Sequence, residues 1–121
     1  MKYDDNNIFA KILRGEIPCK KIYEDDFVLS FYDINPQKKI HALVIPKGKY
    51  VDLDDFSINA SNDEIIGLMK GVTTVAKKLG ISSIDGQGYR ALANISDYGG
   101  QEVPHLHFHL FGGEKVGKMV S

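Results

Sequence analysis

The sequence predicts an α+β fold, with a five-stranded, mostly antiparallel sheet and two helices. Apolar residues and histidines alternate over 105–110, which is the period of a strand with one buried face. Apolar residues recur at helical spacing over 65–79, and short apolar runs separated by turn residues indicate further strands. A chain of 121 residues with 43% hydrophobic content suits one core, so we expect a single domain over 1–121.

The first third of the chain predicts a short helix and then a hairpin. Asn6 or Asn7 caps the helix, and Gly15 ends it. Two strands follow, over 20–24 and 27–32, and the two aspartates between them supply the turn.

The remaining elements are three strands and a long helix. A buried strand is expected over 41–46, and the segment 47–59 is a connector with mixed signals. The long helix runs over 61–80, because a Ser-Asn-Asp-Glu capping box precedes its apolar positions. The last two strands are expected over 88–94 and 103–111.

Composition and charge exclude several classes of partner. With 15 basic and 16 acidic residues the net charge is −1, so the chain lacks the basic surface that nucleic acids or anionic membranes require. No apolar run approaches the ~20 residues of a membrane span. The single cysteine, Cys19, forms no internal disulfide and completes no structural zinc site, and no signal-peptide pattern is present. We therefore expect a cytoplasmic protein.

Three of the four histidines lie at every second position of the last predicted strand. Residues two apart on a strand share a face, so His105, His107 and His109 form a row with spacings of about 6.6–6.8 Å. The apolar residues between them face the core. A glycine pair, Gly99 and Gly100, comes just upstream, and glycines let backbone N–H groups approach an anion closely. A phosphate group can therefore lie beside the histidine row.

The sequence resembles the histidine triad (HIT) family of nucleotide-binding hydrolases and transferases, nearest to bacterial members of its Hint branch. The triad and the Gly-Gly-Gln before it carry this resemblance, which covers about 7–113. Four further segments agree in order and spacing, namely 8–12, 16–20, 31–36 and 41–46.

Imidazole is a good nucleophile toward phosphorus near neutral pH, provided that an acceptor, commonly a backbone carbonyl, holds its second nitrogen. His107 lies at the centre of the row, and it matches the residue that forms the covalent nucleotidyl intermediate in the family. The resemblance implies that His109 lies toward the leaving group and that His105 lies behind the site. It also implies that His41 is next to the triad, hydrogen-bonded to His105.

The resemblance also implies a nucleotide pocket. Asp33 would bind the ribose hydroxyls, which suits a carboxylate because it accepts from two adjacent donors. The walls of the base pocket would be Phe9, Ile12, Ile17, Phe31 and Ile34. Donors to the α-phosphate would come from Asn94, Gly100, Gln101 and Val103.

Two segments depart from the animal members that the chain resembles. Glu102 stands where those members have a serine, and an ionised carboxylate cannot donate to the leaving group as a hydroxyl does. We interpret this as a change in leaving-group handling. Residues 112–121 replace a tryptophan-containing end, which leaves the substrate preference beyond the nucleotide open.

The resemblance implies a homodimeric hydrolase that cleaves the P–N bond of a purine nucleoside phosphoramidate, or a related bond at the α-phosphate, and we expect it to need no cofactor or metal. The alternatives are a dinucleoside polyphosphate hydrolase and a nucleotide-binding regulator with incidental hydrolysis. A metal-binding protein is a third, because histidines two apart on a strand also build zinc sites.

Overall fold

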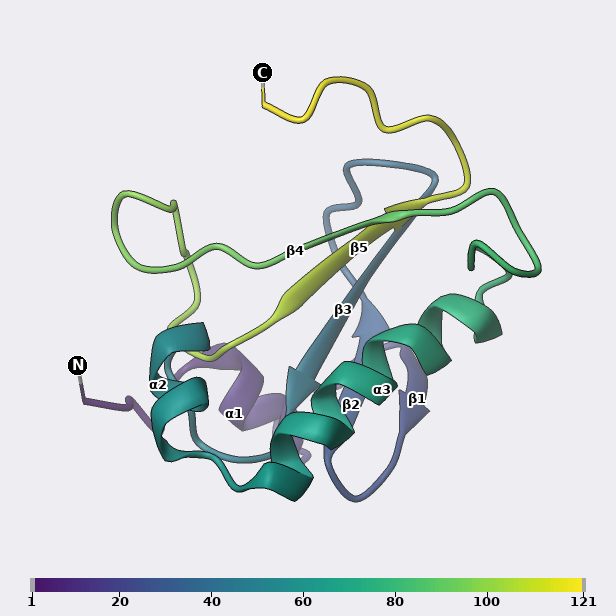
Figure 1. Ribbon diagram of the computed structural model, residues 1–121. Helices are drawn as coiled ribbons and strands as arrows, with labels where there is room; N and C mark the ends of the chain where they lie inside the picture. Colours follow the sequence, from purple (N-terminus) through teal and green to yellow (C-terminus); the bar gives the residue numbers. More distant parts are fainter. Residues whose placement is uncertain (1, 121) are drawn as a thin grey trace.

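The computed structural model describes residues 2–120 as a five-stranded sheet flanked by helices (Figure 1). The strands lie in the order β1-β2-β3-β5-β4, and every neighbouring pair is antiparallel. The predicted fold class is therefore confirmed. The strands are β1 (Lys21–Glu24), β2 (Val28–Tyr32), β3 (Ile40–Pro46), β4 (Arg90–Leu92) and β5 (Phe108–Gly112).

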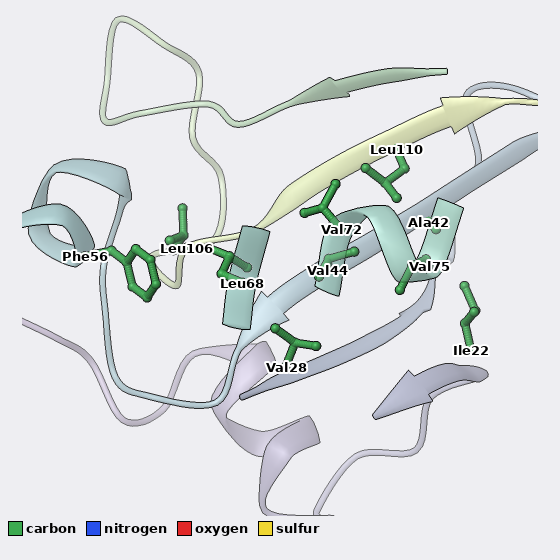
Figure 2. Close-up of a cluster of buried hydrophobic side chains, with 10 residues drawn as sticks. All are labelled: Ile22, Val28, Ala42, Val44, Phe56, Leu68, Val72, Val75, Leu106 and Leu110. Carbon is green, nitrogen blue, oxygen red and sulfur yellow. The ribbon is translucent and has the colours of Figure 1, made fainter. Parts of the chain in front are cut away.

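Helix α3 (Asn62–Lys78) covers one face of this sheet (Figure 1). The predicted capping box is present, since the Ser61 side chain accepts from the Glu64 backbone and the Glu64 carboxylate accepts from the Ser61 backbone. Figure 2 shows apolar side chains of α3 and of the strands meeting in the main core. A Cβ on Gly71 would lie 2.8 Å from a methyl group of Val28, so this glycine lets the helix approach β2 closely.

Helix α1 (Ile8–Leu13) lies on the opposite face of the sheet. Asn7 is its N-cap, accepting from the Ala10 backbone, and Gly15 follows the helix with a positive φ of 79°. Because strand residues alternate between faces, the neighbours of the α3-facing core residues turn toward α1. The resulting second core cluster consists of Phe9, Leu29, Phe31, Leu43 and Ile45.

The segment expected to be a connector contains a third helix, α2 (Leu53–Asn59). Asp52 caps it by accepting from the Asp55 backbone, and the only buried side chain that the helix contributes is that of Phe56. Besides Phe56, only the partly buried Leu53 of this helix packs against the core, and two positions are too few for the helical period to be recognised in the sequence. Among residues 2–120, no helix is long and apolar enough to cross a membrane.

The histidine strand is shorter than predicted, because β5 begins at Phe108 and not at residue 103. Upstream of β5 the backbone turns, with the His105 N–H bonded to the Val103 carbonyl and the Leu106 N–H bonded to the Tyr50 carbonyl. The predicted alternation of faces nevertheless holds. Leu106 and Leu110 are buried in the core under α3, whereas the histidines turn toward α1. The strand expected over 88–94 is likewise shorter, forming only β4.

Candidate active site

A cavity of about 540 Å³ opens on the α1 side of the sheet, beside β5 and the loop that follows β4. Three histidines line it, together with one aspartate, one glutamate and several small or apolar groups. We call it the histidine cavity. Its lining residues are Phe9, Asp33, Asn35, Gln37, His41, Leu43, Leu92, Asn94, Gly100, Glu102, Val103, His107, His109 and Phe111.

The ring of His107 is held by the main chain and by an aromatic neighbour. Its Nδ1 lies 2.7 Å from the His105 carbonyl oxygen, and a carbonyl only accepts, so Nδ1 carries the proton. In the neutral ring the lone pair is then on Nε2. Phe9 packs edge-on against this ring, with the ring centroids 4.9 Å apart. Burial lowers the pKa of His107, so the ring is neutral near pH 7 with an unprotonated Nε2.

His109 and His41 form a hydrogen-bonded pair. The His41 Nδ1 accepts from the Gln37 backbone N–H at 3.1 Å, so the proton of a neutral His41 is on Nε2. That nitrogen lies 2.9 Å from Nδ1 of His109 and donates to it. The proton of a neutral His109 is therefore on its own Nε2. The expected bond between His41 and His105 is wrong, because β3 pairs with β5 in a register that brings His41 to Phe111 and Leu43 to His109.

His105 lies behind the cavity and is fully buried. Its Nε2 is 2.9 Å from the Pro46 carbonyl oxygen, and its Nδ1 is 2.6 Å from the hydroxyl of Tyr3. Burial lowers the pKa of His105 and of His109 to about 4. Burial also lowers the pKa of His41, and the negative charge of the nearby Asp33 carboxylate partly offsets this effect. The site therefore holds neutral imidazoles with fixed proton positions.

Gln101 stabilises the loop after β4 through hydrogen bonds to the backbone. Its predicted role as a donor to the phosphate is therefore wrong. The two protons on its Nε2 go to the carbonyl oxygens of Val51 and Val103, and its Oε1 accepts from the Ser96 backbone. Its backbone N–H is bonded to the Ser96 carbonyl. Ser96 has a positive φ of 58°, which this bracing supports. Gln101 thus shapes the loop and has no donor left for a ligand.

The structure brings together nine of the predicted site residues in the histidine cavity, and it separates others from it. Phe31 is buried behind Phe9, with the rings 5.6 Å apart. Ile12 and Ile17 line a different cleft of about 500 Å³, between the C-terminal end of α1, β1 and β2. Ile34 is 91% exposed in the turn after β2 and lines neither.

A family model for the HIT domain matches residues 14–116. The chain belongs to the HIT domain family. This match confirms the resemblance to the HIT family that the histidine triad and the Gly-Gly-Gln segment indicated.

Several relatives of this HIT protein are bacterial. An uncharacterized 13.2 kDa HIT-like protein of Azospirillum brasilense is 54% identical over 119 residues, which cover 98% of this chain and 95% of that protein. The purine nucleoside phosphoramidase of Escherichia coli K12 is 39% identical over 117 residues, covering 97% and 95%. A solved HIT family hydrolase from Clostridium thermocellum superposes with a TM-score of 0.85 at 38% identity, covering 98% and 99%.

The HIT site contains residues that sequence reasoning missed, namely Asn35, Gln37, Leu43, Leu92 and Phe111. For two of them the strand period supplied a signal, since Leu43 is two residues after His41 and Phe111 is two residues after His109. Phe111 stacks parallel to the His109 ring at 5.7 Å. Leu92 reaches the site because β4 pairs it with His109, a register that no local pattern indicates.

The buried neutral histidines of this HIT domain make its stability depend on pH. In the unfolded chain these rings bind protons below about pH 6.5, whereas in the folded state His105 and His109 bind them only near pH 4. The unfolded state therefore binds more protons in this window, and the free energy of unfolding falls as the pH falls through it. His105 alone contributes a slope of about 1 kcal/mol per pH unit. Urea unfolding between about pH 7 and pH 5 measures this slope, and a flat profile would contradict the buried neutral state.

Proposed function

We propose that this HIT protein is a hydrolase that cleaves the P–N bond of purine nucleoside phosphoramidates at the α-phosphate. The observation that carries this proposal is the pair of opposite proton states on neighbouring rings. His107 presents a lone pair at Nε2, while His109 presents an N–H at Nε2, and the two ring centroids are 5.0 Å apart. A nucleophile and a proton donor thus lie side by side.

The reaction follows in two displacements at phosphorus. The His41–His109 pair gains one proton when the anionic substrate binds. Nε2 of His107 then forms a bond to the α-phosphorus and the P–N bond to the amine breaks. The departing nitrogen takes the proton from Nε2 of His109, and the pair returns to its neutral state. Water then attacks the phosphorus, the bond to His107 breaks, and the His41–His109 pair recovers a proton from that water. A negatively charged phosphoryl group at this face favours the proton-bearing state of the pair.

The nucleoside half of the substrate is assigned to the part of the cavity near α1. The carboxylate of Asp33 is half-buried there, and its Oδ2 lies 3.4 Å from Nε2 of His41. It remains the candidate for the ribose hydroxyls, because a carboxylate accepts two hydrogen bonds at once. Phe9 and Leu43 offer apolar surface for a base. The preference for purines rests on the name of the Escherichia coli relative.

The phosphate half is assigned to the loop between β4 and β5. Asn94, Gly100 and Val103 line the cavity there and are the proposed contacts of the α-phosphate, in place of a set that included Gln101. Glu102 is exposed at the same rim. Its carboxylate is suited to bind a cationic or amine-bearing leaving group and opposes an anionic one, which favours amine leaving groups over nucleoside phosphates.

Asp33, His41 and His109 could also hold a metal ion, since one ligand atom from each lies within 4.8 Å of the others. This cluster keeps a metal-dependent activity open as the second candidate. It uses the same nitrogens that the proposed mechanism uses for proton transfer, so the two accounts predict different responses to a chelator.

Steady-state hydrolysis in excess chelator tests the proposal against these alternatives. An adenosine alkylphosphoramidate is expected to be turned over at an undiminished rate after metal removal, and faster than a diadenosine polyphosphate. Loss of activity on chelation with recovery on adding zinc would support the metal site. Faster cleavage of the diadenosine compound would support a dinucleoside polyphosphate hydrolase. Tight AMP binding with no turnover of either would support a regulator.

We also propose that the protein is a homodimer. Strand β4 forms an edge of the sheet, and no strand among the described residues pairs with its outer side. On α3, Ile66 and Met69 are 52% and 66% exposed, although both are large apolar side chains. A second copy of the chain that pairs with β4 and packs on Ile66 and Met69 would cover the open sheet edge and bury the exposed apolar side chains in one interface.

A further inference from the structure

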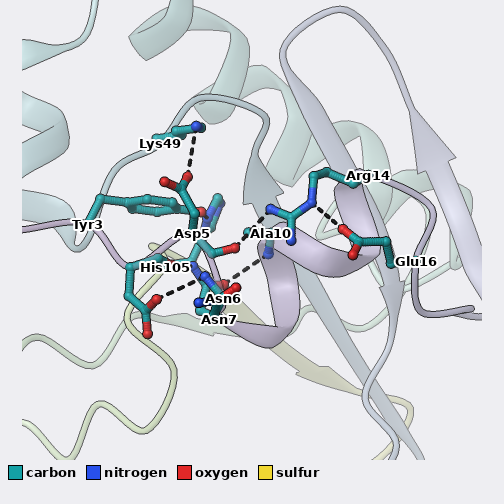
Figure 3. Close-up of polar contacts among 10 residues, drawn as sticks. Tyr3, Asp5, Asn6, Asn7, Ala10, Arg14, Glu16, Lys49 and His105 are labelled. Atoms are coloured by element: carbon teal, nitrogen blue, oxygen red, sulfur yellow. Dashed lines mark hydrogen bonds and ion pairs between the residues drawn. The ribbon is translucent and has the colours of Figure 1, made fainter.

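The N-terminal segment reaches the triad through Tyr3. Its hydroxyl lies 2.6 Å from Nδ1 of His105, and the two rings meet edge to face with centroids 5.6 Å apart. Figure 3 shows this pair together with the polar residues of the segment around it. Tyr3 is 102 residues away from His105 in the sequence.

The direction of this hydrogen bond follows from the other side of the His105 ring. Its Nε2 faces the Pro46 carbonyl oxygen, which only accepts, so the proton of the ring is on Nε2. The ring is neutral, and Nδ1 therefore carries a lone pair. Burial raises the pKa of the Tyr3 hydroxyl, so the phenol keeps its proton. Tyr3 donates, and His105 accepts.

Both nitrogens of His105 are thus held, and this matters for the neighbouring ring. The backbone carbonyl of His105 is the acceptor that fixes Nδ1 of His107, at 2.7 Å. The same residue therefore accepts from Tyr3 through its side chain and from His107 through its main chain. The phenol contact and the Pro46 contact together fix the His105 side chain, and with it the turn whose carbonyl orients His107.

Tyr3 is itself held in place by the residues that follow it. Asp5 forms an ion pair with Lys49 at 2.7 Å, and its carbonyl accepts from the Arg14 guanidinium at 2.8 Å. The Asn7 side chain, which also caps α1, donates to the Asp4 carbonyl at 2.7 Å. These contacts tie the segment to α1 and to the loop after β3, as Figure 3 shows.

We propose that Tyr3 is a positioning residue that holds His105, and through the His105 carbonyl holds His107 in the orientation for attack. This inference rests on the proposed nucleophilic role of His107. It predicts that loss of the phenol hydroxyl lowers kcat while leaving nucleotide affinity unchanged, because Tyr3 does not line the histidine cavity.

The test is Tyr3→Phe, which removes the hydroxyl and keeps the ring that packs on His105. We expect kcat for an adenosine phosphoramidate to fall about tenfold, as for the loss of one hydrogen bond, with the AMP dissociation constant unchanged. In ¹⁵N NMR spectra of the imidazoles, the Nδ1 resonance of His105 should move downfield, as for a lone pair that has lost its donor, and the His107 resonances should move as well.

Tyr23→Phe is the matched control. Tyr23 is also half-buried, and its hydroxyl also makes one hydrogen bond, to Asp25 at 2.8 Å, but it packs against the core under α3. The Tyr23→Phe substitution should leave kcat and the imidazole resonances unchanged. Wild-type kcat and unmoved His105 and His107 resonances in Tyr3→Phe would overturn the proposal. If the wild-type protein cleaves no substrate, the proposed function fails, and the imidazole resonances alone decide whether Tyr3 positions His105.

Discussion

Replacing His107 with alanine is expected to abolish turnover of an adenosine phosphoramidate, lowering kcat by about 10⁴-fold or more. Among the described residues that line the cavity, no other ring nitrogen has a free lone pair held in this way, since Nε2 of His109 carries its proton and Nδ1 of His41 accepts from the Gln37 backbone. Nucleotide binding should persist, because Asp33 and Phe9 are untouched. Single-turnover kinetics and AMP titration measure the two quantities separately.

The His107→Ala variant must be shown to be folded before its inactivity is interpreted. The side chain is 6% exposed and packs on Phe9, so some loss of stability is expected. Unaltered AMP affinity is the control, because it requires an intact cavity. Turnover close to the wild-type rate in a folded variant would exclude His107 as the nucleophile.

Replacing His109 with alanine is expected to slow the reaction in a manner that depends on the leaving group. An alkylamine departs only when protonated, so kcat for an alkylphosphoramidate should fall by about 10²-fold. Fluoride departs without a proton, so an adenosine phosphorofluoridate should be cleaved with a much smaller loss. The ratio of the two losses, measured in parallel on one preparation, reports proton donation by Nε2 of His109.

His41→Ala serves as the companion to this variant. It removes the donor to Nδ1 of His109, so the proton on His109 is no longer directed to Nε2. In His41→Ala, kcat should also fall more for the alkylphosphoramidate than for the phosphorofluoridate, and both decreases should be smaller than in His109→Ala. Equal losses with both substrates in His109→Ala would indicate that this ring binds the phosphoryl group instead of protonating the leaving group.

A helix or strand could be predicted wherever a single local sequence pattern was enough to specify it. The capping box and apolar stripe determined α3, and the alternation around His107 correctly separated the core face from the histidine face. Helix α2 could not be predicted, because only Phe56 and the partly buried Leu53 of this helix pack against the core. The start of β5 could not be predicted either, since tertiary bonds to Tyr50 and Pro46 replace strand pairing there.

The strand period and the family motif were enough to predict the residues of the triad. Both indicated the triad, and the need for a carbonyl at the second nitrogen anticipated the environment of His107. The partner of His41 depends on the register between β3 and β5, which the sequence does not encode locally. The contact of Tyr3 with His105 joins the two ends of the chain, and no spacing rule indicates it.

In the proposed mechanism the phosphorus is attacked twice, first by His107 and then by water. The stereochemical course at phosphorus tests it most directly. A single diastereomer of an adenosine phosphorothioamidate, hydrolysed in ¹⁸O-labelled water, gives a product whose configuration can be assigned. Two in-line displacements predict net retention of configuration. Net inversion would show that water attacks directly, and it would contradict a nucleotidyl intermediate on His107.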